Sequence, residues 1–304
     1  MPVECVGVVG AGVMGSEIAQ VAAAGGLDVL LSDVDQERVD RGVAHVRDIC
    51  ARRVKRGRMS QEDADALVAR VHPVVGLEGL APADLAIEAG TEVMEGKRKV
   101  FSTLDGVLGP DALIASNTSG LSITELGEVT SRPAQVLGLH FFNPASVMRL
   151  VEVIRGEHTG EATLAAGRDL AVSLGKTPVL VRECPGFLVN RILVRAMVES
   201  YRRAAETGAG AAAADAAVVA GGPAPMGPFA LGDLIGLDTM DHIQGDLERA
   251  YGDRFADGGV LAGLVAQGRL GQKSGGGFFD GAAPEAEADA AGRDVAERYY
   301  MSAL

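Results

Sequence analysis

The chain has 304 residues, of which 47% are hydrophobic and 4% aromatic, and its formal net charge is −13. This length is sufficient for two domains, and the negative charge argues against general binding to nucleic acid or anionic membranes. No run approaches the roughly 20 consecutive apolar residues of a membrane span, and the first residues lack the basic and apolar regions of an export signal. The three scattered cysteines, Cys5, Cys50 and Cys184, are typical of reduced thiols and provide no zinc site. We therefore expect a cytoplasmic protein without a bound metal.

The first predicted element is the apolar strand Val3–Val9, which runs directly into the turn sequence Gly-Ala-Gly-Val-Met-Gly. A helix predicted over Ser16–Ala24 follows, so the turn has the strand–turn–helix context of a dinucleotide-binding G-x-G-x-x-G motif. In such a turn the first glycine permits the tight bend and the second lets a pyrophosphate approach the backbone. The third lets the helix pack close to the strand. The predicted cofactor-binding residues here are Gly10, Gly12, Val13, Met14 and Gly15.

The second predicted strand, Val29–Asp33, ends in a carboxylate about 20 residues beyond the last glycine of the turn. A carboxylate at this place accepts hydrogen bonds from the adenosine ribose hydroxyls and repels a 2′-phosphate. Asp33 therefore predicts NAD(H) rather than NADP(H) as the cofactor. The alternative is a glycine-rich strand–helix turn next to a solvated aspartate.

Strand-like runs and helical stretches alternate through the first 185 residues, which predicts a mostly parallel sheet covered on both faces. The further strands are predicted over Leu85–Glu88, Leu113–Ser116, Val136–His140, Leu150–Ile154 and Pro178–Val181. The clearest further helices are predicted over Gln36–Arg56, Glu92–Leu104 and Glu161–Leu174. The prediction is an α/β fold with a Rossmann-type dinucleotide-binding domain over residues 1–184.

Strand signals disappear after the Pro185–Gly186 pair, and the chain from Phe187 to Ala266 has a helical pattern. We therefore predict a smaller, all-α domain over residues 185–281. Its Ala/Gly-rich tract at 208–217 fits either a loop or an alanine helix. The tail at 282–304 carries five acids against two arginines, and we expect it to be a frayed helix or disordered.

Ligands of an open α/β sheet bind beyond the carboxyl ends of its strands, where three polar side chains are candidates. Ser119 follows one predicted strand, His140 ends the next, and Glu152 interrupts the apolar run of a third. A lone buried acid is costly unless it is paired, and a His–Glu pair would meet this requirement and make a general base. The alternative for His140 is a satisfied core histidine. For Ser119 the alternative is a helix cap, although a capping box from Ser122 to Glu125 supplies one already.

Several long segments of the chain resemble the short-chain L-3-hydroxyacyl-CoA dehydrogenases, a family that includes bacterial 3-hydroxybutyryl-CoA dehydrogenases. The resemblance runs from about residue 3 to 281, through GAGVMGSEIAQ, SNTSGLSITEL, HFFNPASVMRLVEVIRG, CPGFLVNRIL, PMGPFALGDLIGLD and GRLGQKSGGGFFD. It implies a dinucleotide-binding domain followed by a helical domain that usually forms a homodimer. The implied reaction is reversible hydride transfer between NAD and a (3S)-3-hydroxyacyl thioester, above all 3-hydroxybutyryl-CoA.

The resemblance also implies a role for individual residues. His140 is the implied catalytic base and Glu152 its orienting partner. Ser119 and Asn190 are implied to hold the substrate oxygens and the nicotinamide region. Without this context, Asn190 is interpreted as a polar residue at a helix start. The further cofactor-binding residues are Glu92, Lys97, Asn117 and Asn143.

The segment Arg52–Arg58 is the one strong basic cluster in this acidic chain. Arg52 and Arg56 are four residues apart and share one helix face. In the family this region receives the CoA phosphates, so the resemblance implies a phosphate clamp. The alternative is a solvated basic face at a helix C-terminus, where the helix dipole favours positive charge.

The chain departs from the family at four places. Gly120 stands where the family usually has a second serine, and Gly90–Val93 replaces a more aliphatic segment. The 208–217 tract is less charged than its family counterpart, and the last 20 or so residues have none that aligns. These departures concern the identity of the acyl group and of its carrier more than the type of reaction.

Three other functions compete with a 3-hydroxyacyl-CoA dehydrogenase. One relative type oxidises a hydroxyacyl group, such as a glyceryl unit, on an acyl carrier protein, and the basic cluster would suit an acidic carrier. A second oxidises a free sugar acid such as gulonate and would have no use for a phosphate clamp. The third is a non-catalytic NAD-binding protein, against which the intact set of candidate catalytic residues argues.

Overall fold

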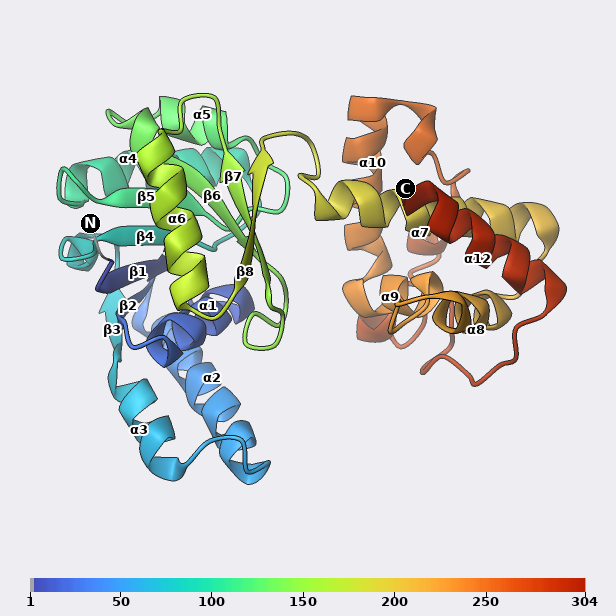
Figure 1. Ribbon diagram of the computed structural model, residues 1–304, viewed down its shortest axis with the longest axis horizontal. Coiled ribbons are helices and arrows are strands. Elements are labelled where there is room, and N and C mark those ends of the chain that lie inside the picture. The colour runs from blue at the N-terminus through green and yellow to red at the C-terminus, as the bar shows by residue number, and fades with distance from the viewer. Residues whose placement is uncertain (1–2, 304) are drawn as a thin grey trace. The chain divides into compact units, whose positions relative to one another are not determined.

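The computed structural model describes residues 3–303, which form two compact units divided in the chain between Phe187 and Leu188 (Figure 1). The first unit contains a single eight-stranded sheet. Its strands are β1 Cys5–Val9, β2 Asp28–Asp33, β3 Val71–Val75, β4 Leu85–Glu88, β5 Leu113–Ser116, β6 Val136–Phe141, β7 Leu150–Arg155 and β8 Thr177–Arg182. Its helices are α1 Val13–Ala24, α2 Gln36–Lys55, α3 Gln61–Ala69, α4 Met94–Val107, α5 Ile123–Glu128 and α6 Glu161–Ser173, with short 3₁₀ turns at Glu78–Leu80 and Pro133–Gln135.

The strand order is β3-β2-β1-β4-β5-β6-β7-β8, and every neighbouring pair is parallel except β6 and β7. The chain leaves β1 toward one edge of the sheet and later returns to β4 on the other side of β1. In open α/β sheets this switch point is where ligands bind, at the carboxyl ends of the strands. The predicted α/β fold with a Rossmann-type domain is confirmed.

Both faces of the sheet are buried, and the alternating direction of side chains along each strand explains how. In β4, Leu85 and Ile87 join the hydrophobic cluster formed with α1, α2 and α6. Ala86, between them, joins the opposite cluster, which is formed with α4 and α5. Because successive strand residues point to opposite faces, a strand covered on both sides is apolar at successive positions, as β4 is from Leu85 to Ile87.

β3 is an edge strand that the sequence pattern does not predict. Its segment Val-His-Pro-Val-Val contains the polar His72 and the ladder-breaking Pro73, both of which are exposed. Proline is tolerated in a strand at the edge of a sheet, where its missing N–H interrupts no inner ladder. Figure 1 shows the helix pair α2 and α3, which leads into β3, extending past the sheet.

The second unit is helical, as the sequence predicts. Its helices are α7 Val189–Thr207, α8 Ala211–Gly221, α9 Pro228–Ile235, α10 Leu237–Tyr251, α11 Val260–Ala266 and α12 Ala290–Ala303, with 3₁₀ turns at Asp253–Phe255 and Gln272–Ser274. Tyr201 of α7 is fully buried and packs against the rings of Phe229 and Phe278, at centroid distances of 5.1 and 4.7 Å. Within residues 3–303, no helix is both long and apolar enough to cross a membrane.

The expectation of a frayed or disordered tail is wrong for Ala290–Ala303, which form α12. Val295, Ala296 and Tyr299 are buried in the hydrophobic core of the second unit. Tyr300 also donates a hydrogen bond to the Val218 carbonyl, at 2.7 Å. Three of the five acids of the tail precede this helix, and Asp294 and Glu297 lie outside its buried stripe, so a count of charges misses the apolar side of an amphipathic helix.

The Ala/Gly tract, which the sequence leaves open between loop and helix, becomes helical from Ala211 onward. Gly208 ends the preceding helix α7 with φ of 70°, a left-handed conformation that favours glycine. Ala214, Ala217 and Val218 of α8 are buried. Alanine is the strongest helix former, and its small side chain permits the close packing of α8 against α12.

Candidate active site

The glycine turn after β1 gives each of its three glycines a different environment. Gly10 has φ of 99°, and a Cβ placed on it would lie 2.9 Å from the Ala89 carbonyl oxygen. A Cβ on Gly15 would lie 1.7 Å from the Gly10 carbonyl oxygen, so the start of α1 requires glycine there. A Cβ on Gly12 would meet no atom within 4 Å. The fold itself therefore explains two of the glycines, and the open backbone at Gly12 is suited to a bound phosphate.

A cavity of about 660 Å³ lies at the switch point of the sheet. It is lined by residues of the glycine turn, by the ends of β2 and β4 and by the start of α2, including Gly10, Gly12, Asp33, Arg38, Arg41, Glu88 and Lys97. Asp33 accepts hydrogen bonds from the backbone N–H groups of Ala11 and Val34, at 2.8 and 2.7 Å. The open glycine, the helix N-terminus and the carboxylate together fit a dinucleotide such as NAD.

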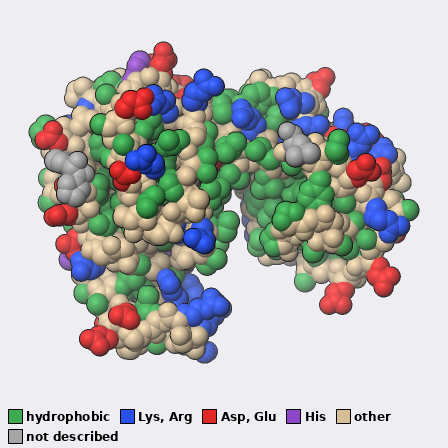
Figure 2. All heavy atoms as spheres, in the orientation of Figure 1, with side chains coloured by type: hydrophobic (Ala, Val, Ile, Leu, Met, Phe, Trp, Pro, Cys, Tyr) green, Lys and Arg blue, Asp and Glu red, His purple; other side chains and the backbone are tan. Residues whose placement is uncertain are grey.

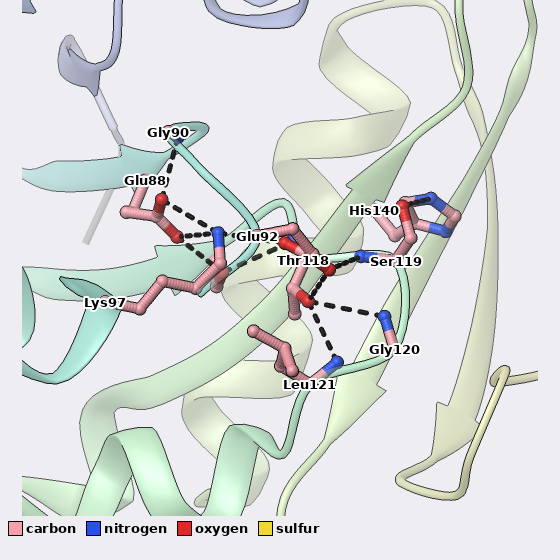
Figure 3. Close-up of polar contacts among 10 residues, drawn as sticks. Glu88, Gly90, Glu92, Lys97, Thr118, Ser119, Gly120, Leu121 and His140 are labelled. Carbon is pink, nitrogen blue, oxygen red and sulfur yellow. Dashed lines mark hydrogen bonds and ion pairs between the residues drawn. The ribbon is translucent and has the colours of Figure 1, made fainter. Parts of the chain in front are cut away.

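Lys97 of α4 is buried between two carboxylates (Figure 3). Its Nζ lies 2.7 Å from Glu88 Oε2 and 3.2 Å from Glu92 Oε2. Glu88, at the end of β4, is itself buried and also accepts a hydrogen bond from Ser116 Oγ at 2.8 Å. Glu88 was not among the predicted site residues. The signal that could have found it is the one that marked Glu152, a single acid in an otherwise apolar strand.

Glu92 joins the loop after β4 to the loop after β5. Its Oε1 accepts hydrogen bonds from the Ser119 N–H, at 2.9 Å, and from the Thr118 hydroxyl. The Thr118 hydroxyl in turn accepts from the Leu121 N–H at 2.9 Å, which shapes the turn around Gly120 (Figure 3). The predicted Glu92, Lys97 and Ser119 are thus parts of one hydrogen-bonded network.

His140 and Glu152 face each other across the antiparallel strands β6 and β7, where they are paired in register. His140 Nδ1 lies 2.7 Å from Glu152 Oε2, and both side chains are buried. Ser119 Oγ lies 3.3 Å from His140 Nε2, and Figure 3 shows the two side chains pointing toward one another. Because the carboxylate accepts the Nδ1 proton, Nε2 is the nitrogen that can exchange a proton with a ligand beside Ser119.

Two asparagines were predicted to contact the cofactor. Asn117 Oδ1 accepts a hydrogen bond from the Phe141 N–H at 2.8 Å, so this oxygen ties the loop after β5 to the end of β6. Asn143 is exposed in the loop that follows β6. The side chain of Asn143 is therefore open to solvent, whereas the Oδ1 atom of Asn117 is already engaged in a hydrogen bond within the protein.

The loop that carries Asn143 is held by two residues that the sequence did not single out. Glu17, buried in α1, accepts a hydrogen bond from the Ser146 N–H at 2.8 Å. Lys176 Nζ donates to the carbonyl oxygens of Ala145 and Met148, the second at 2.9 Å. Desolvation by burial lowers the pKa of Lys176 from its usual value. No local pattern predicts these contacts, because each joins segments far apart in the chain.

The remaining candidates lie elsewhere. Asn190 is in the first turn of α7 and therefore in the second unit. Arg52 is exposed in the last turn of α2, and Arg56 is exposed at its C-cap. Figure 2 shows basic side chains gathered at this end of the first unit. Within the described part of the chain, neither arginine has an acidic partner, and no three His, Cys, Asp or Glu side chains are grouped to hold a metal ion.

Two family models match the chain. Residues 5–184 match the NAD-binding domain of 3-hydroxyacyl-CoA dehydrogenase, and residues 186–281 match its C-terminal domain. The 3-hydroxybutyryl-CoA dehydrogenase of Bradyrhizobium diazoefficiens is 41% identical over 276 residues, which cover 90% of this chain and 94% of that protein. The 3-hydroxyadipyl-CoA dehydrogenase of Escherichia coli is 40% identical over 280 residues, which cover 91% of this chain and 59% of that protein.

Solved structures agree with these matches. The crystal structure of (S)-3-hydroxybutyryl-CoA dehydrogenase PaaH1 from Ralstonia eutropha has a TM-score of 0.88 at 40% identity and covers 91% of this chain and 98% of that one. The fold, the dinucleotide-binding turn and the buried His–Glu pair are thus found in a chain that belongs to the 3-hydroxyacyl-CoA dehydrogenase family and is an NAD-binding oxidoreductase.

Proposed function

We propose that this protein interconverts (3S)-3-hydroxyacyl-CoA and 3-oxoacyl-CoA, with 3-hydroxybutyryl-CoA and acetoacetyl-CoA as its substrates. The observation that carries the proposal is the buried pair of His140 and Glu152, with Ser119 Oγ 3.3 Å from His140 Nε2. A base with an orienting carboxylate and a neighbouring hydroxyl is what oxidation of a secondary alcohol requires. The names of the relatives at about 40% identity support the acyl group, although they include both hydroxybutyryl and hydroxyadipyl thioesters.

In this proposal His140 Nε2 accepts the proton of the substrate's 3-hydroxyl group. Glu152 holds the ring through Nδ1 and stabilises the positive charge that the imidazole gains. Ser119 donates a hydrogen bond to the same substrate oxygen and so favours the developing carbonyl. Asn190 is proposed as a second ligand of the substrate on the strength of its motif. NAD, when bound, supplies the hydride acceptor.

We assign the 660 Å³ cavity to the adenosine and pyrophosphate part of NAD. The buried network around Lys97 extends from this cavity to Ser119, so cofactor and substrate ligands would be held by one set of hydrogen bonds. The proposed cofactor-binding residues are Gly10, Gly12, Val13, Met14, Gly15, Asp33, Glu92, Lys97, Asn117 and Asn143.

For the carrier we propose CoA, with Arg52 and Arg56 contacting its phosphates. Their exposure and the absence of an acidic partner in the described chain leave both guanidinium groups available for a phosphate. An acyl carrier protein is the second candidate, because the same basic cluster complements an acidic protein surface. A free sugar acid, the third candidate, would not need the basic cluster.

One experiment compares these substrates directly. NADH oxidation is measured side by side with acetoacetyl-CoA, an acetoacetyl-carrier protein and free oxo acids, at matched concentrations. The proposal expects the highest kcat/KM with acetoacetyl-CoA. A clear preference for the carrier protein or a free acid would reject CoA as the carrier, and inactivity with all of them would reject the acetoacetyl group as the substrate.

We further propose that the protein is cytoplasmic and forms a homodimer through its helical unit. Large apolar side chains are exposed on this unit at Val219, Met226, Leu234 and Ile235. Such exposed apolar groups are typical of protein–protein interfaces. Light scattering on the purified chain measures the mass in solution, and Leu234→Arg should shift a dimer toward monomer. A monomeric wild type would reject the dimer.

A further inference from the structure

We propose that Glu183 is a positioning residue that holds Ser119 at its distance of 3.3 Å from His140. Glu183 lies in the first unit, directly after β8. It acts through two segments, the loop that carries Ser119 and the turn that leads to Phe187. The inference rests on the proposed function, because Ser119 and His140 are the side chains that are proposed to act on the substrate.

The carboxylate of Glu183 is bound by the start of α5. Its Oε2 accepts hydrogen bonds from the N–H and from the hydroxyl of Thr124, both at 2.7 Å. Its Oε1 accepts a hydrogen bond from the hydroxyl of Ser122, the N-cap residue of the helix. The first N–H groups of a helix have no partner within the helix, and a carboxylate from another segment can satisfy them. Glu183 thus fixes where α5 begins.

The loop that carries Ser119 is held by a carboxylate at each end. At its start, Glu92 Oε1 accepts a hydrogen bond from the Ser119 N–H at 2.9 Å (Figure 3), and at its end Glu183 binds the first turn of α5. Between these ends lies Gly120, on which a Cβ would meet no atom within 4 Å. Because glycine has more backbone freedom than any other residue, the middle of the loop is not restrained by its own side chains. The place of Ser119 therefore depends on both carboxylates.

Glu183 also begins a segment that packs against His140. Its N–H donates to the Arg155 carbonyl oxygen at 2.9 Å, which continues the pairing of β8 with β7. Four residues later, Phe187 is fully buried, and its ring centroid lies 6.0 Å from that of His140, within the range of packed rings. The Phe187 N–H donates to the Cys184 carbonyl oxygen at 2.9 Å, which closes the turn between them. The segment thus holds the serine loop through its carboxylate and packs against the imidazole through its phenyl ring.

The first test measures the position of Ser119 without turnover. The full chain is isotopically labelled at the Cε1 carbon of histidine, and the His140 signal is identified in carbon–proton correlation spectra by its loss in His140→Gln. Ser119→Ala should shift this signal, because Ser119 Oγ lies beside His140 Nε2. Glu183→Ala should shift the same signal in the same direction and leave the signals of the other histidines in place.

The second test measures turnover with acetoacetyl-CoA and NADH. Glu183→Ala should lower kcat by about tenfold, because a small displacement of a group at the reacting centre is costly. The affinity for NADH should stay at its wild-type value, since Glu183 does not line the cofactor cavity. In the Ser119→Ala chain the same substitution should lower kcat by no more than about twofold, because two residues that act through one contact do not have additive effects.

Asp105→Ala is the matched control. Asp105 accepts hydrogen bonds from the N–H and the hydroxyl of Ser131, at 2.7 and 3.1 Å, and so anchors the loop after α5 as Glu183 anchors its start. This variant should be less stable in urea but keep the wild-type kcat and the wild-type His140 signal. Glu183→Gln keeps the length of the side chain and one acceptor oxygen, so it serves if Glu183→Ala folds poorly. It should shift the same signal and lower kcat by about threefold.

The inference is overturned if the His140 signal of the Glu183 variants stays at its wild-type position, or if Asp105→Ala shifts it as far. It is also overturned if Glu183→Ala and Ser119→Ala lower kcat independently. A signal that moves while neither substitution affects kcat would support the positioning and reject the proposed role of Ser119 in turnover. If the wild type is inactive with the thioester, the proposed function fails, and the His140 signal decides the inference alone.

Discussion

The two units both bury carboxylates, and the catalytic candidates of the first unit differ in their partners from three aspartates of the second. In the first unit Glu152 is paired with His140 and Glu88 with Lys97, side chains that can lose or share a proton. In the second unit Asp215 accepts hydrogen bonds from two backbone N–H groups at the start of α9, at 2.9 and 2.8 Å.

Two other aspartates of the second unit repeat this pattern. Asp233 accepts from the backbone of Phe278 and Phe279, and Asp257 accepts from the N–H groups of Gly259 and Leu261, which lead into α11. Backbone donors cannot titrate, so these carboxylates act as anchors for loops and helix ends. The comparison shows that burial of an acid does not by itself mark a site. An ion pair does not mark one either, since the buried Glu199 of the second unit is paired with Arg195 and Arg202.

The largest expected effect comes from the buried histidine of the first unit. His140→Gln removes the base, and kcat should fall by about 10²–10⁴-fold while NADH binding survives. Steady-state kinetics and NADH fluorescence measure the two quantities. The matched control is His158→Gln. His158 is also next to a glutamate, with its Nε2 3.8 Å from Glu128 Oε1, but both side chains are exposed. Near-normal turnover of the His140→Gln chain would remove this residue from the mechanism.

Glu152→Gln keeps the shape of the partner and removes its charge. The imidazole then loses both a fixed orientation and the stabilisation of its protonated form, so kcat should fall by about 100-fold. The pH dependence of kcat should change with it, which a loss of packing alone would not produce. Glu128→Gln serves as the surface counterpart. An unchanged pH profile would contradict the assigned role of Glu152.

Asp215 offers the opposite test, since a structural carboxylate should affect stability and not turnover. Burial raises its pKa from 3.8 to about 6. The folded chain therefore holds this proton more tightly than the unfolded chain, so the stabilisation is complete at low pH and is lost as pH rises through 6. Between pH 4 and 7 this contribution to the free energy of unfolding falls by about 2 kcal/mol.

The comparison of wild type with Asp215→Asn isolates that contribution, because the variant cannot titrate here. Urea unfolding of the full chain at several pH values should show the wild type losing stability relative to the variant as pH rises. The kcat of the two chains should agree near neutral pH. A constant stability difference across this range, or a large loss of kcat in the variant, would break the distinction between the two units.

The smallest effect is expected at the exposed basic cluster. Replacing Arg52 and Arg56 by alanine should raise KM for an acyl-CoA by up to about tenfold and leave kcat intact, because contacts remote from the reacting carbon act as uniform binding. A truncated thioester without the nucleotide should be unaffected. Arg70→Ala, at another exposed arginine of the first unit, is the control. If KM for the acyl-CoA and KM for the truncated thioester respond equally to the two substitutions, the cluster is only a solvated helix face.

Local sequence determined a large part of this protein. The turn from Gly10 to Gly15 between an apolar strand and a helix specifies a dinucleotide-binding unit, because Gly10 adopts a positive φ and Gly15 must pack against the Gly10 carbonyl oxygen within the same turn. The alternation of strands and helices before Pro185, and its end there, predicts the two kinds of unit. The edge strand β3 escaped prediction because its polar residues and Pro73 give no local pattern.

Tertiary structure decided the contacts that complete the candidate site. The antiparallel register of β6 and β7 places His140 opposite Glu152, and the fold brings Glu92 to Ser119 across two loops. The same holds for α12, whose apolar stripe becomes core only when α7 and α8 are packed against it. Pairings between distant segments depend on strand register and on packing. The residues next to a side chain in the sequence therefore do not predict them.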